Sequence, residues 1–274
     1  MLLHIVIDID PFAIHFPAGW WVEGIRWYGV CYVVSFFLVQ FFLAFYSRKG
    51  LSPLSSEENE ALLIYFALGA VMGGRLGYCL LYDFDNFSTN PLIFFQIWRG
   101  GMASHGGFAG GILAILYFSW RYRRDRYRVG DVVSSIIPLC LMVGRLGNFV
   151  NGELLGRETA VPWGVIFVRD GVLGLVARHP SPLYEAFFEG FLPFIILQIL
   201  IYRRCCIGYL GGIFLVLYAI GRIGCEFFRE PDAGLILGLT RGQFYSLFLL
   251  FLGIFLIIFV SRRRRGIRLG PPDN

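Results

Sequence analysis

Three arginines stand next to glycines within apolar stretches of this sequence. They are Arg75 and Arg145, each within a "GRLG" motif, and Arg222, within "GRIG". A guanidinium group presents paired N–H donors in a planar fork that matches the oxygens of a phosphate or a carboxylate. A neighbouring glycine carries no Cβ, so it exposes the backbone and lets an anion approach. The recurring motif therefore predicts a binding site for an anion.

Further polar residues follow two of these arginines at helical spacing. They are Asn148 and Asn151 after Arg145, and Glu226 and Arg229 after Arg222. Residues three or four positions apart share one face of a helix. The polar face of a membrane helix lies toward a cavity or the bundle interior rather than toward lipid. Glu153 and Glu226 are candidates for acid–base chemistry, or each of them pairs with an arginine.

His105, which precedes two glycines, is the candidate for proton transfer. Imidazole titrates near neutral pH, so a positioned histidine can accept a proton from a reacting group. The alternative role is a hydrogen-bonded anchor at a membrane interface. Tyr28, in "RWYG", is either a donor to a lipid headgroup or an interfacial aromatic residue. The sequence contains no G-x-S-x-G, H-E-x-x-H or Walker motif and no cysteine–histidine cluster, so we expect neither a metal nor another cofactor.

The composition is that of an integral membrane protein. Of 274 residues, 57% are hydrophobic and only 16% are charged, whereas soluble domains contain about a quarter charged residues. The formal net charge of +5 does not indicate a nucleic-acid-binding protein. The arginines form clusters in loops and at the ends of apolar segments, and they do not form one basic surface.

Apolar segments of about 20 residues are long enough to span a membrane as helices. Seven such segments lie near residues 24–46, 61–82, 102–120, 131–151, 182–201, 208–228 and 242–261. The sequence therefore predicts an all-α integral membrane protein with seven transmembrane helices in a single polytopic domain, 1–274. Within the third segment, the pairs Gly106/Gly110 and Gly107/Gly111 predict a close contact with another helix.

The distribution of basic residues predicts the orientation. Loops on one side of the predicted helices contain 14 arginines and lysines, and those on the other side contain six. The more basic side lies in the cytoplasm by the positive-inside rule, so the N-terminus lies outside and the C-terminus inside. The three motif arginines then lie near the outer ends of the second, fourth and sixth helices, with Arg26 at a similar depth. This layer indicates either a cavity for an anionic phospholipid of the outer leaflet or side chains that extend to lipid phosphates.

Two outside segments have predicted features of their own. Residues 91–101 are apolar but too short to span the membrane, so they predict a re-entrant or interfacial segment. Residues 152–181 form an extracytoplasmic head loop between the fourth and fifth helices. The strand-like apolar runs on either side of Asp170 and Gly171 predict a small β-hairpin in this loop.

Five motifs follow one another along the chain. They are "HGG" at 105–107, "GRLGNFVNGE" at 144–153, "RHPSPLYE" at 178–185, "EFFREPD" at 226–232 and "GQ" at 242–243. In this order they resemble the bacterial prolipoprotein diacylglyceryl transferase family, and the similarity spans roughly residues 24–260. The resemblance implies seven helices in the bacterial cytoplasmic (inner) membrane, with the orientation inferred above and an active site toward the outer leaflet.

The resemblance also implies a reaction and its partners. The diacylglyceryl group of phosphatidylglycerol is transferred to the lipobox cysteine thiol of a preprolipoprotein, glycerol 1-phosphate leaves, and a thioether remains. The implied partners are phosphatidylglycerol, the lipobox segment and membrane lipids, with no nucleic acid and no cofactor.

Roles for particular residues follow from the same resemblance. Arg145 resembles the family's phosphatidylglycerol-binding arginine, Arg222 its second essential arginine, and His105 its candidate base. Positions that match residues associated with function are Tyr28, Asn148, Asn151, Glu153, Gly156 and Glu226. Arg229 and Arg75 are further candidates for substrate binding, and Arg75 either binds substrate or braces the fold.

Two other functions stay open from the residues alone. One is a transporter or flippase for an anionic lipid, and the other is a non-catalytic lipid-binding scaffold. A transporter needs polar residues that continue to the inner side, but the second, fourth and sixth predicted helices are apolar in their inner halves apart from Ser134 and Ser135. A scaffold would not need His105 near the arginines.

Overall fold

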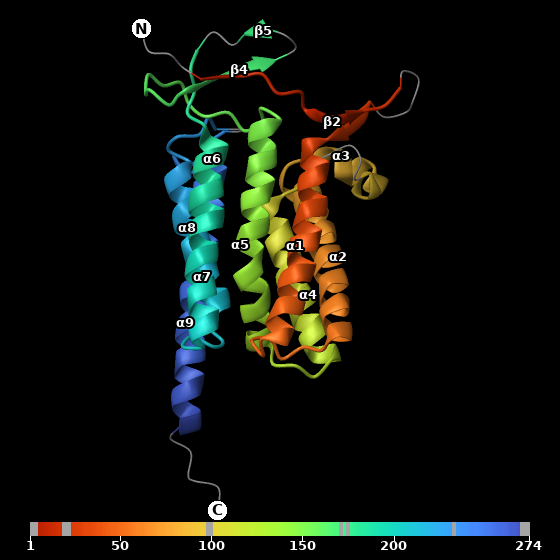
Figure 1. Ribbon diagram of the computed structural model, residues 1–274, viewed down its shortest axis with the longest axis vertical. Coiled ribbons are helices and arrows are strands. Elements are labelled where there is room, and N and C mark those ends of the chain that lie inside the picture. Colours follow the sequence, from red (N-terminus) through yellow and green to blue (C-terminus); the bar gives the residue numbers. More distant parts are fainter. Residues whose placement is uncertain are drawn as a thin grey trace, which may run out of the picture. The chain divides into compact units, whose positions relative to one another are not determined.

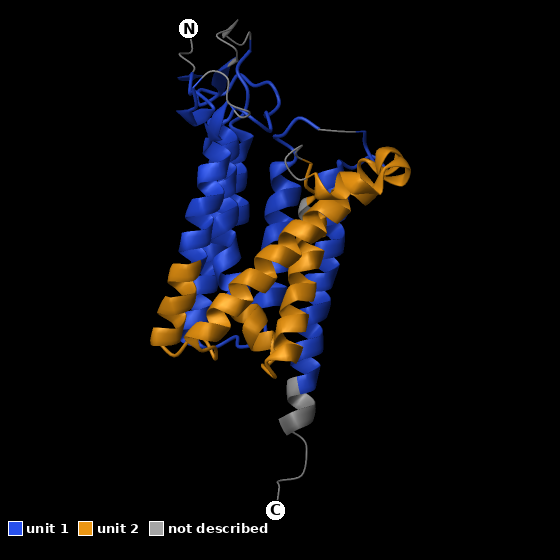
Figure 2. Ribbon diagram, turned by 90° about the vertical axis from the view of Figure 1, so that its right-hand side faces the viewer, with its two compact units in different colours: residues 1–39, 133–274 blue, residues 40–132 orange. Residues whose placement is uncertain are grey.

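The computed structural model is predominantly helical (Figure 1) and describes residues 5–17, 23–96, 101–169, 172–173, 176–231 and 234–268. The chain forms two compact units, which Figure 2 distinguishes by colour. Unit 1 comprises residues 1–39 and 133–274, and unit 2 comprises residues 40–132.

Long helices account for most of the described chain. They are α1 (Trp27–Arg48), α2 (Ser56–Leu81), α4 (Ser104–Arg121), α5 (Arg126–Val150), α7 (Leu192–Arg203), α8 (Leu210–Cys225) and α9 (Arg241–Arg268). The shorter helical elements are α3 (Phe84–Thr89), the 3-10 helix η1 (Pro91–Phe95), α6 (Ser181–Glu185) and the π-helical segment η3 (Ala186–Phe191). The run α6–η3–α7 is continuous, so it forms one helical rod with a wider turn near its start.

Five helical segments of the described chain are long and apolar enough to cross a membrane. They are Trp27–Arg48, Ser56–Leu81, Arg126–Val150, Ser181–Arg203 and Arg241–Arg263. The prediction of a helical membrane protein is thereby confirmed. The third and sixth predicted spans contain α4 and α8, which are shorter helices of 18 and 16 residues.

Side-chain caps determine where two of the long helices begin. The Ser55 hydroxyl accepts a hydrogen bond from Glu58 N at 3.2 Å, and the Glu58 carboxylate accepts one from Ser55 N at 2.8 Å. Thr240 and Gln243 form the same reciprocal pair before α9, at 3.1 and 3.2 Å. Such pairs satisfy N–H groups that the first turn of a helix leaves without an intrahelical partner. Gln243 of the "GQ" motif is therefore a helix-capping residue.

Glycines bring helices α2 and α4 of unit 2 into backbone contact. A Cβ added to Gly73 would overlap the carbonyl oxygen of Gly106, and one added to Gly69 would lie 2.6 Å from the carbonyl oxygen of Gly110. Only residues without a side chain allow two backbones to approach this closely. The close contact predicted from Gly106 and Gly110 is confirmed.

Short strands in unit 1 accompany the helices. They are β1 (Ile5–Ile7), β2 (Phe12–His15), β3 (Gly24–Arg26), β4 (Val165–Arg169) and β5 (Val172–Leu173). Strand β4 pairs in parallel with β1 and antiparallel with β5, and β2 pairs antiparallel with β3. Figure 1 shows β4 and β5 beyond the end of α6. The predicted turn at Asp170 and Gly171 lies outside the described residues.

The start of the first helix differs from the predicted span 24–46. Helix α1 begins at Trp27, and Arg26 lies in strand β3 with its guanidinium 5.1 Å from the centroid of the Phe12 ring. The backbone hydrogen bonds of the β2–β3 pair hold Arg26 extended, so it is not a helical residue.

Candidate active site

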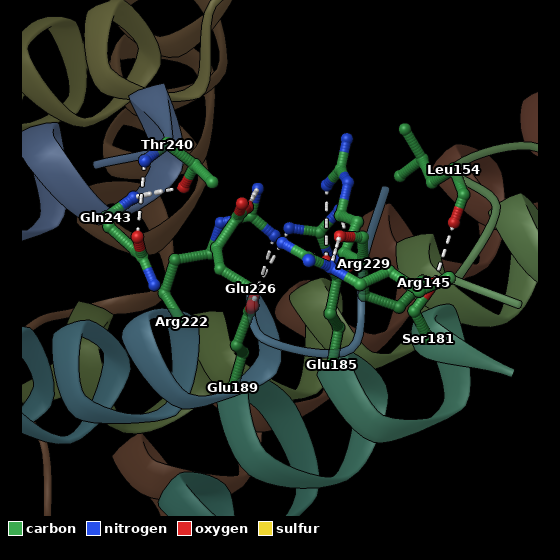
Figure 3. Close-up of polar contacts among 11 residues, drawn as sticks. Arg145, Leu154, Ser181, Glu185, Glu189, Arg222, Glu226, Arg229, Thr240 and Gln243 are labelled. Atoms are coloured by element: carbon green, nitrogen blue, oxygen red, sulfur yellow. Dashed lines mark hydrogen bonds and ion pairs between the residues drawn. The ribbon is translucent and has the colours of Figure 1, made fainter. Parts of the chain in front are cut away.

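A network of arginine and glutamate side chains joins separate helices of unit 1. Its members are Arg145 in α5, Glu185 in α6, Glu189 in η3, Arg222 in α8, and Glu226 and Arg229 directly after α8. Figure 3 shows these side chains converging on one another from the different helices. The second and third copies of the arginine motif, predicted to serve one site, are therefore brought together.

Glu185 holds the centre of this network. Its Oε2 atom lies 3.0 Å from Arg145 Nη1, and its Oε1 atom lies 2.5 Å from Arg222 Nη1 and 3.2 Å from Arg229 Nη1. Glu189 bridges the two motif arginines as well, at 3.0 Å from Arg145 and 3.4 Å from Arg222. Two carboxylates therefore fix the separation and the orientation of two guanidinium forks.

The network is charge-balanced and nearly closed to solvent. Three guanidinium groups meet three carboxylates, and the side chains of Glu185 and Glu189 are fully buried (0%). Buried charges are retained only where partners compensate their lost hydration. Arg145 and Arg222 keep 16% and 11% of their side-chain surface exposed, so they can contact a ligand. Among the residues that the structure describes, no group of His, Cys, Asp and Glu side chains could hold a metal ion.

The members of the network take different positions along their helices. Arg222 stands in the last turn of α8, where the helix dipole favours a cation, whereas Arg145 lies five residues before the end of α5. Glu185 and Glu189 are the fifth and ninth residues of the rod α6–η3–α7, beyond its first turn. Both acids belong to the turns where the rod changes from α-helix to π-helix, a rare irregularity that often marks functional sites.

Glycines let η3 lie against both neighbouring helices. A Cβ added to Gly190 of η3 would lie 2.6 Å from the Cβ of Met142 in α5. One added to Gly221 of α8 would lie 2.6 Å from the carbonyl oxygen of Phe188 in η3. Because these contacts are tighter than side chains permit, the two glycines set the distances across which the ion pairs form.

The "GQ" motif supports the network from α9. A Cβ added to Gly242 would overlap the carboxylate of Glu226 and lie 3.1 Å from Arg222 Nη2. Glu226 occupies that space and lies 2.5 Å from Arg222, one helical turn away. Gly242, the first residue of the motif, therefore leaves room for the Glu226 carboxylate, and Gln243, the second, caps α9.

Asn148, Asn151 and Glu153 form a second polar cluster at the end of α5. Asn148 Nδ2 donates to Glu153 Oε2 at 3.0 Å, and Asn151 Nδ2 donates to Glu153 Oε1 at 3.3 Å. Gly152 has a φ of +63°, a left-handed conformation that glycine adopts readily and that turns the chain back at the helix end. Glu153 therefore binds two side-chain amides, whereas Glu226 pairs with an arginine.

Tyr28 lies on α1 where this helix approaches α5. A Cβ added to Gly147 would lie 3.4 Å from Tyr28 Cδ2 and 2.9 Å from Cys31 Sγ. The Tyr28 hydroxyl is 3.1 Å from the hydroxyl of Tyr32. Because Gly147 directly precedes Asn148, the last glycine of the second motif brings Tyr28 to the same end of α5 as the asparagine cluster.

Gly156 lies where three chain segments meet. A Cβ here would overlap the carbonyl oxygen of His179, the Gly156 carbonyl accepts a hydrogen bond from Arg178 Nη1 at 3.0 Å, and the residue forms a β-bridge with Arg229. Gly156 therefore positions the backbone that carries Arg229.

Burial lowers the pKa of the His179 imidazole below its usual range.

Arg75 and His105 belong to unit 2, whereas the other predicted site residues belong to unit 1. His105 is the second residue of α4 and is half-buried. Arg75 is buried, and its guanidinium donates to backbone carbonyl oxygens. The predicted layer of guanidinium groups and the predicted proximity of His105 to the arginines stay predictions.

Two central residues of the network, Glu185 and Glu189, were not predicted as site residues. They stand one turn apart near the start of the predicted span 182–201. Two carboxylates in an apolar helix need buried partners as much as the arginines do. That signal was present in "LYEAFFEG" and would have assigned both acids to the arginines.

The whole site lies within a sequence range shared with known proteins. A model of the family described as prolipoprotein diacylglyceryl transferase matches residues 18–259. The chain is 41% identical over 258 residues to the phosphatidylglycerol–prolipoprotein diacylglyceryl transferase of Pseudoalteromonas translucida. The aligned region covers 93% of this chain and 94% of that protein. It is 37% identical to the protein of the same name from Proteus mirabilis, with 97% of each chain covered. The arginine motifs, the acids that pair with them and the "GQ" glycine all fall within the matched range, and this chain belongs to the prolipoprotein diacylglyceryl transferase family.

Proposed function

We propose that this protein transfers the diacylglyceryl group of phosphatidylglycerol to the lipobox cysteine of a preprolipoprotein. The observation that carries the proposal is the buried network in which Arg145 and Arg222 share Glu185 and Glu189. It holds two guanidinium forks in fixed orientation among apolar helices, as recognition of a lipid phosphate requires. The names of the relatives specify the same lipid and the same class of acceptor.

The reaction forms one carbon–sulfur bond and breaks one carbon–oxygen bond. The thiolate of the acceptor cysteine attacks the glycerol carbon that bears the phosphate ester. The bonding electrons leave with the phosphate, glycerol 1-phosphate departs, and a thioether remains. The proton of the thiol passes to a base. The nucleophile belongs to the acceptor, so the reaction needs none of the six cysteines of this chain.

The arginines stabilise the charge that develops on the departing phosphate. The ion pairs of Arg145 engage Nη1 and Nη2 once each, whereas a guanidinium has five N–H donors. Donors therefore remain for phosphate oxygens, and Arg222 serves as the partner of Arg145. Donors fixed before the reaction act most strongly on a developing anion, because they need no reorganisation. A guanidinium group directly beside the acceptor thiol stabilises its thiolate, although the network as a whole is charge-balanced.

The remaining site residues supply a base and the surroundings of the headgroup. His105 accepts the thiol proton. Tyr28, Asn148, Asn151 and Glu153 present hydroxyl, amide and carboxylate groups that suit a glycerol headgroup. Glu226, Arg229 and Gly156 hold the arginine network in place.

We also propose seven membrane helices within one membrane domain, with the N-terminus outside, the C-terminus in the cytoplasm and the head loop 152–181 on the outer side. The five long apolar segments, together with α4 and α8, account for the seven predicted spans. The 14 to six distribution of basic residues supports the orientation. The membrane is the bacterial inner membrane, and the active site faces its outer leaflet.

The function is tested with purified protein, phosphatidylglycerol and a synthetic lipobox peptide. We expect the peptide to gain the mass of one diacylglyceryl group and glycerol phosphate to appear in equal amount. A peptide with serine in place of the lipobox cysteine is the control and should stay unmodified. Binding of phosphatidylglycerol without transfer would reject the proposal in favour of a lipid-binding scaffold.

The base is tested separately with His105→Gln. Loss of a general base lowers a rate by about 100- to 10,000-fold, and the remaining activity should rise with pH as the thiol ionises without help. Full activity of this variant between about pH 6 and pH 9, a range that brackets the pKa values of histidine and cysteine, would contradict the role of His105.

A further inference from the structure

Arg75, the arginine of the first motif, is surrounded by backbone carbonyl oxygens. Its Nη2 donates to Ile93 O at 2.6 Å and to Gln96 O at 3.1 Å, its Nε to Phe94 O at 3.2 Å, and its Nη1 to Gly101 O at 3.0 Å. The residue is only 3% exposed. Of the five N–H donors of a guanidinium, at least four are therefore directed at the backbone.

These carbonyls belong to the two ends of the connection between η1 and α4. Three of them lie at the end of η1, where Ile93 O also accepts a hydrogen bond from Gln96 N at 3.0 Å. The fourth belongs to Gly101, shortly before the first residue of α4. Gly101 has a φ of +81°, and a Cβ there would lie 2.5 Å from the ring of Tyr78. Arg75 thus ties both ends of the connection to α2.

The same stretch of α2 also holds the first turn of α4. The Gly74 carbonyl accepts a hydrogen bond from Ala103 N at 2.9 Å. A Cβ added to Gly77 would lie 2.9 Å from Gly106 Cα. Residues 73–77 therefore fix the chain from Gly101 to Gly106, and this fixed segment contains His105.

We propose that Arg75 is a positioning residue for His105 that acts through the backbone and does not bind the lipid phosphate. To reach a phosphate, the guanidinium would have to release the four carbonyl oxygens that it now bridges, and the loss of those hydrogen bonds is unfavourable. The inference rests on the proposed function, in which His105 accepts the thiol proton. It assigns one of the two roles that the sequence left open for Arg75.

Arginine is required here because of its shape. Its fork delivers donors in several directions from one rigid plane, whereas a lysine carries three donors on a single flexible nitrogen. Arg75→Lys can keep the positive charge but cannot bridge Gln96 and Gly101 at once. The start of α4, and His105 with it, should then be less well fixed.

The test compares the transfer kinetics of Arg75→Lys with those of the wild type. We expect kcat to fall about 10- to 100-fold, because a misplacement of about 1 Å has that effect, while the KM for phosphatidylglycerol stays within about twofold. Arg124→Lys is the matched control, since Arg124 forms an exposed two-point pair with Glu58 elsewhere in unit 2. Wild-type kcat in Arg75→Lys, or a raised KM with kcat unchanged, would overturn the inference.

A double-mutant cycle with His105→Gln separates positioning from general weakening of the fold. If Arg75 acts through His105, adding Arg75→Lys to His105→Gln should lower the rate by less than about twofold. Independent losses that multiply would reject the inference. Arg75→Gln is a second variant for the same cycle. If neither variant folds, Arg75 serves the fold as a whole, and the positioning role is rejected.

The position of His105 can also be tested without measuring catalysis, by the chemical reactivity of its imidazole. Diethylpyrocarbonate acylates accessible imidazoles, and mass spectrometry gives the rate for each histidine. We expect Arg75→Lys to change the rate at His105 at least threefold and to leave His179 unchanged. A wild-type protein without transferase activity would refute the proposed function, whereas unchanged reactivity of His105 would refute only the role of Arg75.

Discussion

The same four residues, "GRLG", occur at 74–77 and at 144–147, but the two arginines bind different kinds of partner. Arg75 in unit 2 donates to four backbone carbonyl oxygens at 2.6–3.2 Å. Arg145 in unit 1 pairs with two carboxylates, Glu185 and Glu189, at 3.0 Å each. The motif determines that a guanidinium is buried, and the neighbouring segments determine what it does.

The difference between the two sites is one of charge and of remaining donors. Carbonyl oxygens carry only partial charges and are part of the backbone, so they fix the chain around Arg75. Carboxylates carry full charges on side chains, and they leave Arg145 with unused N–H donors. The Arg145 side chain keeps 16% of its surface exposed. A buried arginine held by backbone organises structure, whereas one held by acids can share its donors with an incoming anion.

The largest effect should follow from Glu185→Gln, because Glu185 contacts all three arginines of the network. The change leaves one positive charge without its counter-charge in a buried site, and such a loss destabilises by about 3–5 kcal/mol. Thermal or denaturant unfolding in detergent measures it. Added phosphatidylglycerol should restore more stability to this variant than to the wild type, because the lipid supplies the missing negative charge.

Glu230→Gln is the matched control for that experiment. Glu230 pairs with Arg178, but its side chain is 56% exposed, and exposed pairs contribute about 0–1 kcal/mol. If Glu185→Gln cost no more than Glu230→Gln, the network would not be the charged centre that distinguishes it from the Arg75 site.

The sequence predicted the helices and the burial of the arginines for a simple physical reason. A residue such as Arg145 in an apolar segment must find partners, whatever the fold. The partners themselves come from other helices, and helical spacing defines a face but not which neighbour lies against it. Glu185 and Glu189 could have been identified by the same burial argument. The choice between carbonyls and carboxylates could not, because it depends on how a connection folds back in space.

Short elements were less predictable than long ones. Strand β1 has three residues and pairs with β4 more than 150 positions away in the chain. Its sequence, "IVI", resembles many apolar segments, and only the three-dimensional fold selects its partner. Arg26 was assigned to a helix for the same reason, since a three-residue strand directly before α1 has no periodicity of its own.

Arg145→Lys should give the next largest effect, a fall of about 100- to 1,000-fold in the transfer rate. A lysine keeps the charge but cannot contact Glu185, Glu189 and a phosphate oxygen from fixed directions. The matched change Arg203→Lys, at the exposed end of α7, should leave the rate unchanged. The comparison sharpens further with Arg75→Lys, in which we expect a smaller loss. Equal losses in both motif variants, or a wild-type rate in Arg145→Lys, would contradict the distinction between the two sites.

The glycines of the third motif separate packing from access to the anion. A Cβ on Gly221 would lie 2.6 Å from the carbonyl oxygen of Phe188, whereas one on Gly224 would meet no atom within 4 Å. Gly221→Ala should therefore destabilise by about 1–3 kcal/mol, and Gly224→Ala should fold at least as stably as the wild type, because alanine is the better helix former. Unfolding measurements on both variants check this. If the stable Gly224→Ala variant also transfers lipid more slowly, the substrate approaches the network on that side.

The smallest effect should be a pH dependence of the folding stability that arises from His179 in unit 1. Burial lowers the pKa of His179, whose Nδ1 lies 3.2 Å from the hydroxyl of Tyr184. Between this lowered pKa and the ordinary value of about 6.5, the unfolded chain binds more protons than the folded one. Stability should therefore fall as the pH drops below about 6.5, and the loss should be complete below the folded-state pKa.

His179→Gln removes that contribution, so its stability should depend less on pH between about 5 and 7 than that of the wild type. Unfolding measured at a series of pH values in that interval decides the point. The pH profile of transfer should stay as in the wild type, because the base in the proposed mechanism is His105 in unit 2. A pH profile that shifts in His179→Gln would instead connect His179 to the chemistry. Proton transfer would then not be confined to unit 2, and the contrast between a positioning site around Arg75 and a charged site around Arg145 would not hold.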